Sequence, residues 1–198
     1  MKIDVGTKKL LERLTSKVNE AMQAHTAYVN DCSTQDTPLP YYSRFKLYTL
    51  FDTSYTPVVQ YNLLDNGTDT IYLDGTLNAW KKANEIEKPE LTISNVMDYA
   101  KMVVSSISKE NIKHNIVTSI EDIDFYQMPT VEQFQLIESS IKPPVISFRN
   151  NSFNILACLI EGKELYDSLI SVKSTGEIEI SDKNLILQDI PVDEFAWD

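Results

Sequence analysis

Apolar side chains recur at steps of three and four residues in four stretches of the chain, a spacing that places them on one face of an α-helix. The predicted helices cover residues 8–29 with Thr7 as N-cap, residues 77–88 before Pro89, residues 93–108 capped by Thr92, and residues 130–141 opening with the capping box Thr130-x-x-Gln133. Between the first helix and the next apolar stretch, residues 30–40 are polar and have the composition of a loop.

Other stretches are rich in β-branched and aromatic residues and are bounded by turn-forming residues, which is typical of strands. The predicted strands cover residues 41–51, 55–64, 70–73, 114–120, 145–150, 153–160, 164–173, 177–181 and 184–188. Asn66-Gly67 predicts a tight hairpin turn before residues 70–73, because both residue types accept positive φ angles. Short turns between the last five strands indicate antiparallel neighbours.

Helices come first and a strand meander closes the chain, which indicates an α+β fold. We expect a single domain over residues 1–198, with the long N-terminal helix and further helices packed on a curved, mainly antiparallel sheet, as in cystatin- or NTF2-like folds. The run from Phe153 to Ile160 is apolar on both faces, so we predict a central strand covered by helices on one side and by a partner chain on the other. Leu156 is then a core residue.

The charge of the chain narrows the choice of partners. Its 198 residues are 42% hydrophobic, enough for a core, and its formal net charge is −11 with 18 basic residues. Binding to nucleic acid or to an anionic membrane needs a basic face, so neither is expected, whereas a basic protein partner is favoured. No apolar run approaches the roughly 20 residues that span a bilayer, and no secretory signal is visible, which predicts a cytoplasmic protein with both cysteines reduced.

The stretch "IYLDGTL" resembles the first motif of the haloacid-dehalogenase phosphatases, in which two aspartates one residue apart hold magnesium and attack phosphate. Asp74 matches the second aspartate, but Tyr72 stands at the position of the nucleophile and cannot replace a carboxylate. We therefore interpret Asp74-Gly75 as a turn that leaves a strand.

No other motif predicts a catalytic residue, a metal site or a cofactor. The chain has two histidines, His25 and His114, and no HExxH pattern for zinc. It has five glycines and none of the glycine-rich phosphate loops. The sequence therefore leans away from an enzyme.

The segments "IYLDGTLNAWKKANEIEKPELTISNVMDYAKMVV", "EDIDF" and "NLILQDIPV" are similar to a group of bacterial proteins that has no assigned activity. The resemblance covers about residues 70–192. It implies a bacterial origin and one fold unit, and it implies no reaction.

Two functional hypotheses remain. The first is a non-enzymatic acidic interaction domain that masks a basic partner, as immunity proteins and secretion chaperones do, or that pairs as a homodimer. The alternative is a small-molecule-binding or weakly hydrolytic domain with a pocket between helices and sheet, lined by Tyr72, Asp74, Trp80 and Asp122.

The C-terminal segment "QDIPVDEFAWD" combines two large apolar side chains, Phe195 and Trp197, with four carboxylates. It is expected either to fold back over the core or to act as an acidic, aromatic recognition segment for a basic groove.

Overall fold

The computed structural model describes residues 5–108 and 112–193. The described chain divides into two compact units, which are treated separately below: unit 1 comprises residues 5–74 and 78–88, and unit 2 comprises residues 75–77, 89–108 and 112–193. The α+β class is confirmed, with an N-terminal helix, antiparallel sheets and a C-terminal strand meander. That residues 1–198 make one domain stays a prediction.

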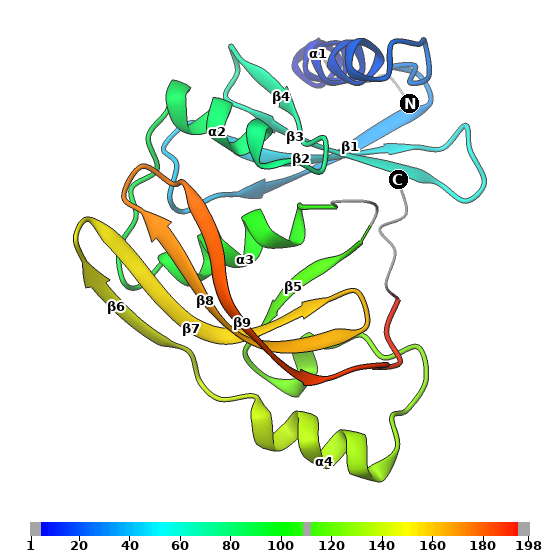
Figure 1. Cartoon of the computed structure of the whole chain (residues 1–198). Coiled ribbons are helices and arrows are strands. Elements are labelled where there is room, and N and C mark those ends of the chain that lie inside the picture. Colours follow the sequence, from blue (N-terminus) through cyan, green and yellow to red (C-terminus); the bar gives the residue numbers. More distant parts are fainter. Residues whose placement is uncertain (1–4, 109–111, 194–198) are drawn as a thin grey trace. The chain divides into compact units, whose positions relative to one another are not determined.

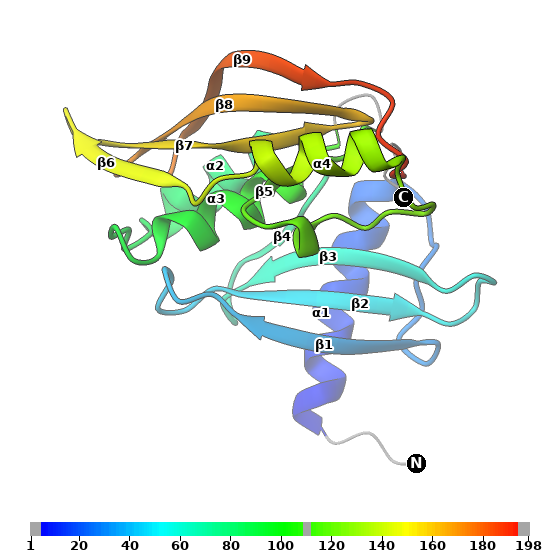
Figure 2. The same cartoon turned by 90° about the horizontal axis from the view of Figure 1, so that it is seen from below.

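Unit 1 is an antiparallel sheet with a long helix on one face (Figures 1 and 2). Its elements are α1 (Val5–Met22), β1 (Cys32–Pro38), β2 (Lys46–Asp52), β3 (Val59–Asp65), β4 (Thr70–Tyr72) and α2 (Leu77–Ile86), and the strand order is β1-β2-β3-β4. The apolar stripe of α1, with Leu14 and Val18 at its centre, packs on Leu50 and Leu63 of the sheet.

Several boundaries predicted in unit 1 are wrong, including the start of the strand predicted over residues 41–51, which begins at Lys46. The first helix ends at Met22 instead of residue 29, because Gln23 adopts a left-handed conformation with φ of 52°, and Thr7 lies inside the helix instead of capping it. Residues 30–40 are not a loop, since Cys32–Pro38 pair with β2 along their whole length. β1 is an edge strand, so its side chains remain mostly exposed and lack an apolar pattern.

The predicted hairpin between β3 and β4 is confirmed, but only Gly67 of the predicted pair has a positive φ, and Asp65 pairs with Thr70 across a turn of four residues. Gly67 has a φ of 91°, and the side-chain oxygen of Asn66 accepts the amides of Thr68 and Asp69. The turn thereby fixes β4 against β3, with Leu64 opposite Ile71.

Unit 2 is a five-stranded antiparallel sheet with one helix on each face. Its elements are α3 (Val96–Ser105), β5 (His114–Val117), the 3₁₀ helix η2 (Ile120–Asp122), α4 (Val131–Ser140), β6 (Val145–Arg149), β7 (Ser152–Glu161), β8 (Glu164–Lys173) and β9 (Ile178–Leu187). The order is β5-β7-β8-β9, and β6 also pairs with β7. The two predicted strands at 177–188 form the single strand β9, which bends at Asp182, where φ is 48°.

β7 is the central strand, as predicted, but it is covered on both faces only over its second half. α3 packs over β5 and β8 on one face. On the other face α4 and the C-terminal segment form a core cluster: Val117, Ile123, Ile137, Cys158, Ile160, Leu165, Ile190 and Val192. This cover does not extend to Leu156, whose side chain is 51% exposed. The prediction that Leu156 lies in the core is therefore wrong.

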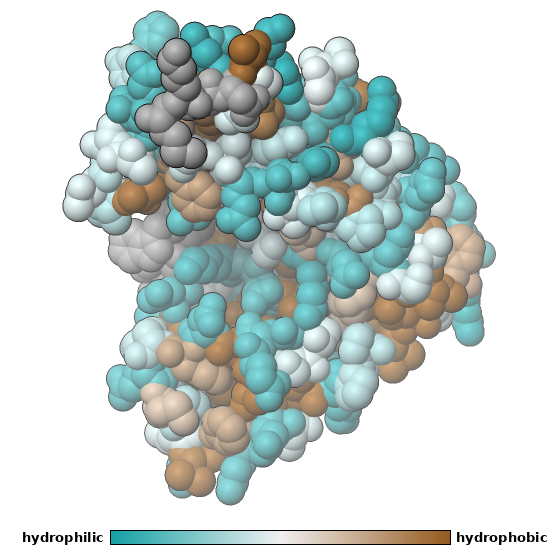
Figure 3. All heavy atoms as spheres, turned by 180° about the vertical axis from the view of Figure 1, so that it is seen from behind, coloured by the Kyte–Doolittle hydropathy of each residue, from teal (hydrophilic) through white to brown (hydrophobic). Residues whose placement is uncertain are grey.

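Leu156 and two residues of β6 leave apolar side chains exposed at this edge of the sheet, Val145 and Leu156 on one face and Phe148 on the other. Val145, directly opposite Leu156, is 60% exposed, and Phe148 is 48% exposed. Figure 3 shows hydrophobic residues gathered on the side of the molecule where β6 lies.

Candidate functional site

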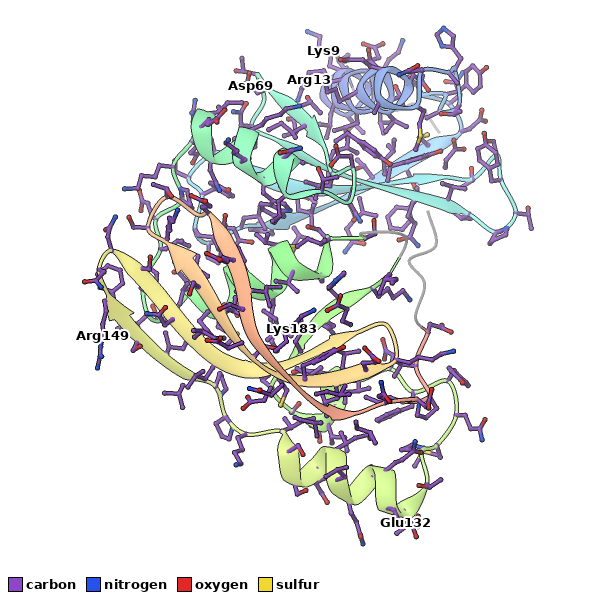
Figure 4. All side chains as sticks on the ribbon, in the orientation of Figure 1. Lys9, Arg13, Asp69, Glu132, Arg149 and Lys183 are labelled. Carbon is purple, nitrogen blue, oxygen red and sulfur yellow. The ribbon has the colours of Figure 1, made fainter. Side chains whose placement is uncertain are left out.

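Unit 1 has an open groove of about 740 Å³ between α1 and α2, with β4 along its floor. We call it the β4 groove. Its lining residues are Lys17, Glu20 and Ala21 of α1, residues 68–72 and Asp74 of the β4 region, and Ala79, Lys82, Glu85 and Ile86 of α2. Figure 4 shows Asp69 at the turn that closes one end.

Each wall of the groove follows from the local sequence. α1 buries Leu14 and Val18 on the sheet, so that Lys17, Glu20 and Ala21, which flank this stripe, face the groove. α2 likewise buries Trp80 and Ala83 and leaves Lys82 and Glu85 exposed. The polar faces of the two amphipathic helices thus form the walls.

Negative charge prevails in the groove. Its lining contains the four carboxylates of Glu20, Asp69, Asp74 and Glu85, against the two ammonium groups of Lys17 and Lys82. Lys17 pairs with Glu20 at 3.0 Å, so these two charges offset each other and the other three carboxylates outnumber Lys82.

α1 turns its C-terminal half to the groove, and α2 lines the groove from Ala79 near its start to Ile86 at its end. A helix C-terminus carries a partial negative charge, which basic residues in the last turn usually offset. Neither α1 nor α2 has a basic residue in its last turn. The backbone therefore adds to the field of the carboxylates, and the groove favours cationic groups.

The sequence-predicted residues fall in different places. Tyr72 and Asp74 both line the β4 groove, and the half-buried Tyr72 ring contacts the Tyr61 ring at 6.4 Å between centroids. Trp80 lies on α2, but its side chain is 2% exposed and belongs to the core. The groove wall is formed by its neighbour Ala79 instead.

Asp122 lies in unit 2, where it anchors η2 and the end of β5. Its Oδ2 accepts the amide and hydroxyl of Thr118, both at 2.7 Å, and the ammonium of Lys101 at 2.9 Å. Burial alone would raise the pKa of this carboxyl, but these hydrogen bonds lower it to about 2. The carboxylate is therefore held as a structural anion.

The histidines do not converge on the groove. His25 is exposed after the end of α1, and His114 places its Nδ1 3.0 Å from the carbonyl of Ile112. Among residues 5–108 and 112–193, no cluster of three histidine, cysteine or acidic side chains could hold a metal ion.

The C-terminal segment packs on its own unit as far as the structure describes it. The amide of Ile190 donates to the carbonyl of Lys163 at 3.0 Å, and the amide of Tyr126 donates to the carbonyl of Pro191 at 3.1 Å. Phe195 and Trp197 lie outside the described residues, so both expectations for them stay predictions.

Sequence reasoning missed Glu20, Asp69, Lys82 and Glu85, which supply most of the charge of the groove. Each stands on the polar face of a helix or in a turn, where charged residues are common. What distinguishes them is the meeting of α1 and α2 beside β4, which no local pattern reveals.

Comparisons with protein-family models, with curated proteins and with solved structures found no match for this chain. In the part of the chain that the structure describes, no helix combines the length and the apolar composition needed to cross a membrane.

Proposed function

We propose that this protein is a non-enzymatic interaction domain that binds a basic protein partner in the β4 groove. The observation that carries the proposal is the open groove in which four carboxylates and two uncompensated helix C-termini face two lysines. The net charge of −11 also attracts a basic partner at long range, which increases the rate at which the two proteins meet.

The alternative, a small-molecule-binding or weakly hydrolytic domain, would use the same Tyr72 and Asp74. Small-ligand sites are concave and mostly apolar, with a few convergent polar groups. Here the carboxylates are spread over α1, the β3–β4 turn and α2, and the groove is open. This arrangement fits a partner that extends along the groove better than a small enclosed ligand.

The proposal is tested with a lysine-rich peptide as the probe and the full chain as the receptor. Glu20→Lys reverses a charge in the groove and should weaken binding about fivefold, which corresponds to about 1 kcal/mol for a charge pair near the surface. Raising the salt concentration should weaken binding by the wild-type protein as well.

Glu12→Lys is the matched control. Glu12 lies on the same helix, is exposed and also pairs with a lysine, Lys8 at 3.8 Å, but it does not line the groove. It should leave the affinity nearly unchanged. If both variants weaken binding equally, attraction depends on net charge alone and the β4 groove is not the binding site.

A further inference from the structure

β6 is an outer strand of the sheet in unit 2 and has an open edge. It pairs with β7 on one side, and Figures 1 and 2 show no other strand beyond it within residues 5–108 and 112–193. Open edges are usually protected by charges, by bulges or by a covering element. β9, at another edge of the sheet, has such protection: the charged Asp182 and Lys183, the bend at Asp182 and the register shift toward β8.

β6 has none of these protections along its middle. Its only charged residue is Arg149 at the end, which points away from the sheet in Figure 4. Its apolar side chains are exposed on both faces, since Val145 and Phe148 point to opposite sides of the sheet and are 60% and 48% exposed. The exposed Leu156 extends the apolar surface to β7.

The turn after β6 fixes which of its backbone groups point outward. Asn150 and Asn151 both have positive φ angles, 51° and 63°, and form a two-residue hairpin in which Arg149 and Ser152 are paired. In such a hairpin the pair that flanks the turn exchanges its hydrogen bonds, and the pattern alternates from there. The N–H and C=O groups of Ile146 and Phe148 therefore turn away from β7, toward the open edge.

A second β6 strand satisfies this edge. An antiparallel copy related by a two-fold axis at Ser147 places Ile146 opposite Phe148 of the second copy, and the reverse. The backbone groups of Ile146 and Phe148 point toward the open edge, so Ile146 of one copy and Phe148 of the other exchange backbone hydrogen bonds. The side chains of this cross-strand pair are both apolar.

The distribution of charge also permits this contact between two acidic molecules. Residues 139–160 contain no Asp or Glu, although the chain has 29 acidic residues in total. The β6–β7 hairpin is thus a place where two copies can meet without opposing carboxylates. We infer that the protein forms a two-fold homodimer in which β6 strands pair across the axis and Ile146 of each copy lies against Phe148 of the other.

The test is the mass of the full chain in solution, measured by sedimentation. The wild-type chain should have twice the mass of one chain at high micromolar concentration, and added salt should strengthen the dimer because it screens the repulsion between two acidic molecules. The opposite salt dependence expected for peptide binding in the β4 groove separates the two proposals. A wild-type chain that stays monomeric up to millimolar concentration overturns the dimer alone.

Two matched variants locate the contact. Phe148→Lys should dissociate the dimer, since it places a charge opposite Ile146 at the axis. Leu185→Lys changes an equally exposed apolar residue on the edge strand β9 and should leave the dimer intact. A dimer that survives Phe148→Lys, or that is lost equally in both variants, does not form through β6.

A cross-link tests the register without depending on stability. The two Ser147 residues face each other in a non-hydrogen-bonded pair, whose Cα atoms lie about 4.5 Å apart. Ser147→Cys should therefore form an intermolecular disulfide under mild oxidation, whereas the exposed Arg149→Cys, two residues from the axis, should not. Both native cysteines are buried and do not compete. Equal cross-linking in both variants overturns the two-fold register.

Discussion

The two units bury different kinds of groups. In unit 1 the buried polar side chains include two carboxylates, Asp52 and Asp65, whereas among the described residues of unit 2 the buried polar side chain is the hydroxyl of Ser168. Asp122 of unit 2 pairs with a lysine, but its side chain is 30% exposed, against 2% for Asp65. Unit 1 therefore adds a buried ion pair at Asp65 to its apolar core, and it also buries one oxygen of Asp52 without a hydrogen-bond partner among the described residues, whereas unit 2 depends on apolar packing across its long strands.

The network of Asp65 shows what this burial involves. Its carboxylate accepts Arg13 at 2.8 Å, the Thr70 hydroxyl at 2.6 Å and the Gly67 amide at 2.9 Å. Burial would raise its pKa, but these bonds lower it, with Arg13 contributing most. The same network joins α1 to the β3–β4 turn, so the charges that stabilise unit 1 also hold two walls of the β4 groove in place. In unit 2 the open edge strand β6 carries the exposed apolar residues Val145 and Phe148, and the contact we propose there is correspondingly apolar.

The largest effect is expected in the apolar core of unit 2. Ile155→Ala removes a fully buried side chain from the central strand β7 and should lower the free energy of unfolding by about 4 kcal/mol. Leu156→Ala, on the next residue, should cost less than about 1 kcal/mol in the monomer because half of that side chain is exposed. Urea denaturation at low protein concentration measures both. If both variants lose the same unfolding free energy, the side chain of Leu156 is packed as fully as that of Ile155, and the first half of β7 is covered on both faces.

The second effect concerns the buried ion pair of unit 1. Arg13→Ala leaves the Asp65 carboxylate buried with two hydrogen bonds and no cation, and should cost about 3 kcal/mol. Lys101→Ala makes the same change beside the more exposed Asp122 and should cost about 1 kcal/mol. If Lys101→Ala costs as much as Arg13→Ala, burial of the carboxylate does not explain the difference between the units.

A smaller effect should appear in acid. The pKa of Asp122 is about 2 in the folded protein and 3.8 as its ordinary value. The unfolded chain therefore binds the proton more readily, and ionised Asp122 contributes on the order of 2 kcal/mol that is present above about pH 4 and lost as the pH falls toward 2. Asp122→Asn should remove this pH dependence from the free energy of unfolding, whereas Asp124→Asn, at an exposed neighbour, should retain it. An unchanged acid profile in Asp122→Asn would contradict the assignment.

Local signals in the sequence located most elements, and long-range packing decided the rest. The turn at Asn66-Gly67 and the capping box at Thr130 were predictable because a few neighbouring residues determine each of them. β1 was missed because an exposed edge strand needs backbone pairing with its neighbour and no apolar pattern of its own. The end of α1 was missed because the helical spacing of apolar residues continues to Tyr28 past the left-handed Gln23.

The candidate sites show the same limit. Tyr72 and Asp74 were candidates because they lie in the stretch "IYLDGTL", and the structure places both in the β4 groove. The groove itself forms because α1 and α2 lie on either side of β4, and no local motif predicts that arrangement. Leu156 was indistinguishable from Cys158 in an apolar run, and only the reach of α4 and the C-terminal segment separates them. Which apolar residues remain exposed depends on the lengths of covering elements, and that information is spread over the whole chain.

The smallest effect concerns the helix starts in unit 2, where two threonines were predicted as caps and one prediction is wrong. The Thr130 hydroxyl accepts the Gln133 amide at 3.2 Å, and the Thr130 amide donates to the Gln133 side chain at 3.1 Å, which confirms the capping box. Thr92 does not cap α3 with its side chain: its carbonyl accepts the Val96 amide at 2.9 Å, and its hydroxyl meets that of Ser94.

Thr130→Ala removes a side-chain acceptor from the first turn of α4 and should cost about 1 kcal/mol of unfolding free energy. Thr92→Ala keeps the carbonyl that accepts the Val96 amide in the turn before α3, and it should cost less than about 0.5 kcal/mol, as surface substitutions usually do. Urea denaturation of the two variants side by side gives the comparison. A larger loss of unfolding free energy for Thr92→Ala than for Thr130→Ala would mean that the Thr92 hydroxyl stabilises α3. A larger loss for Thr130→Ala would show that a threonine before a helix stabilises it only where its hydroxyl accepts a backbone amide of the first turn.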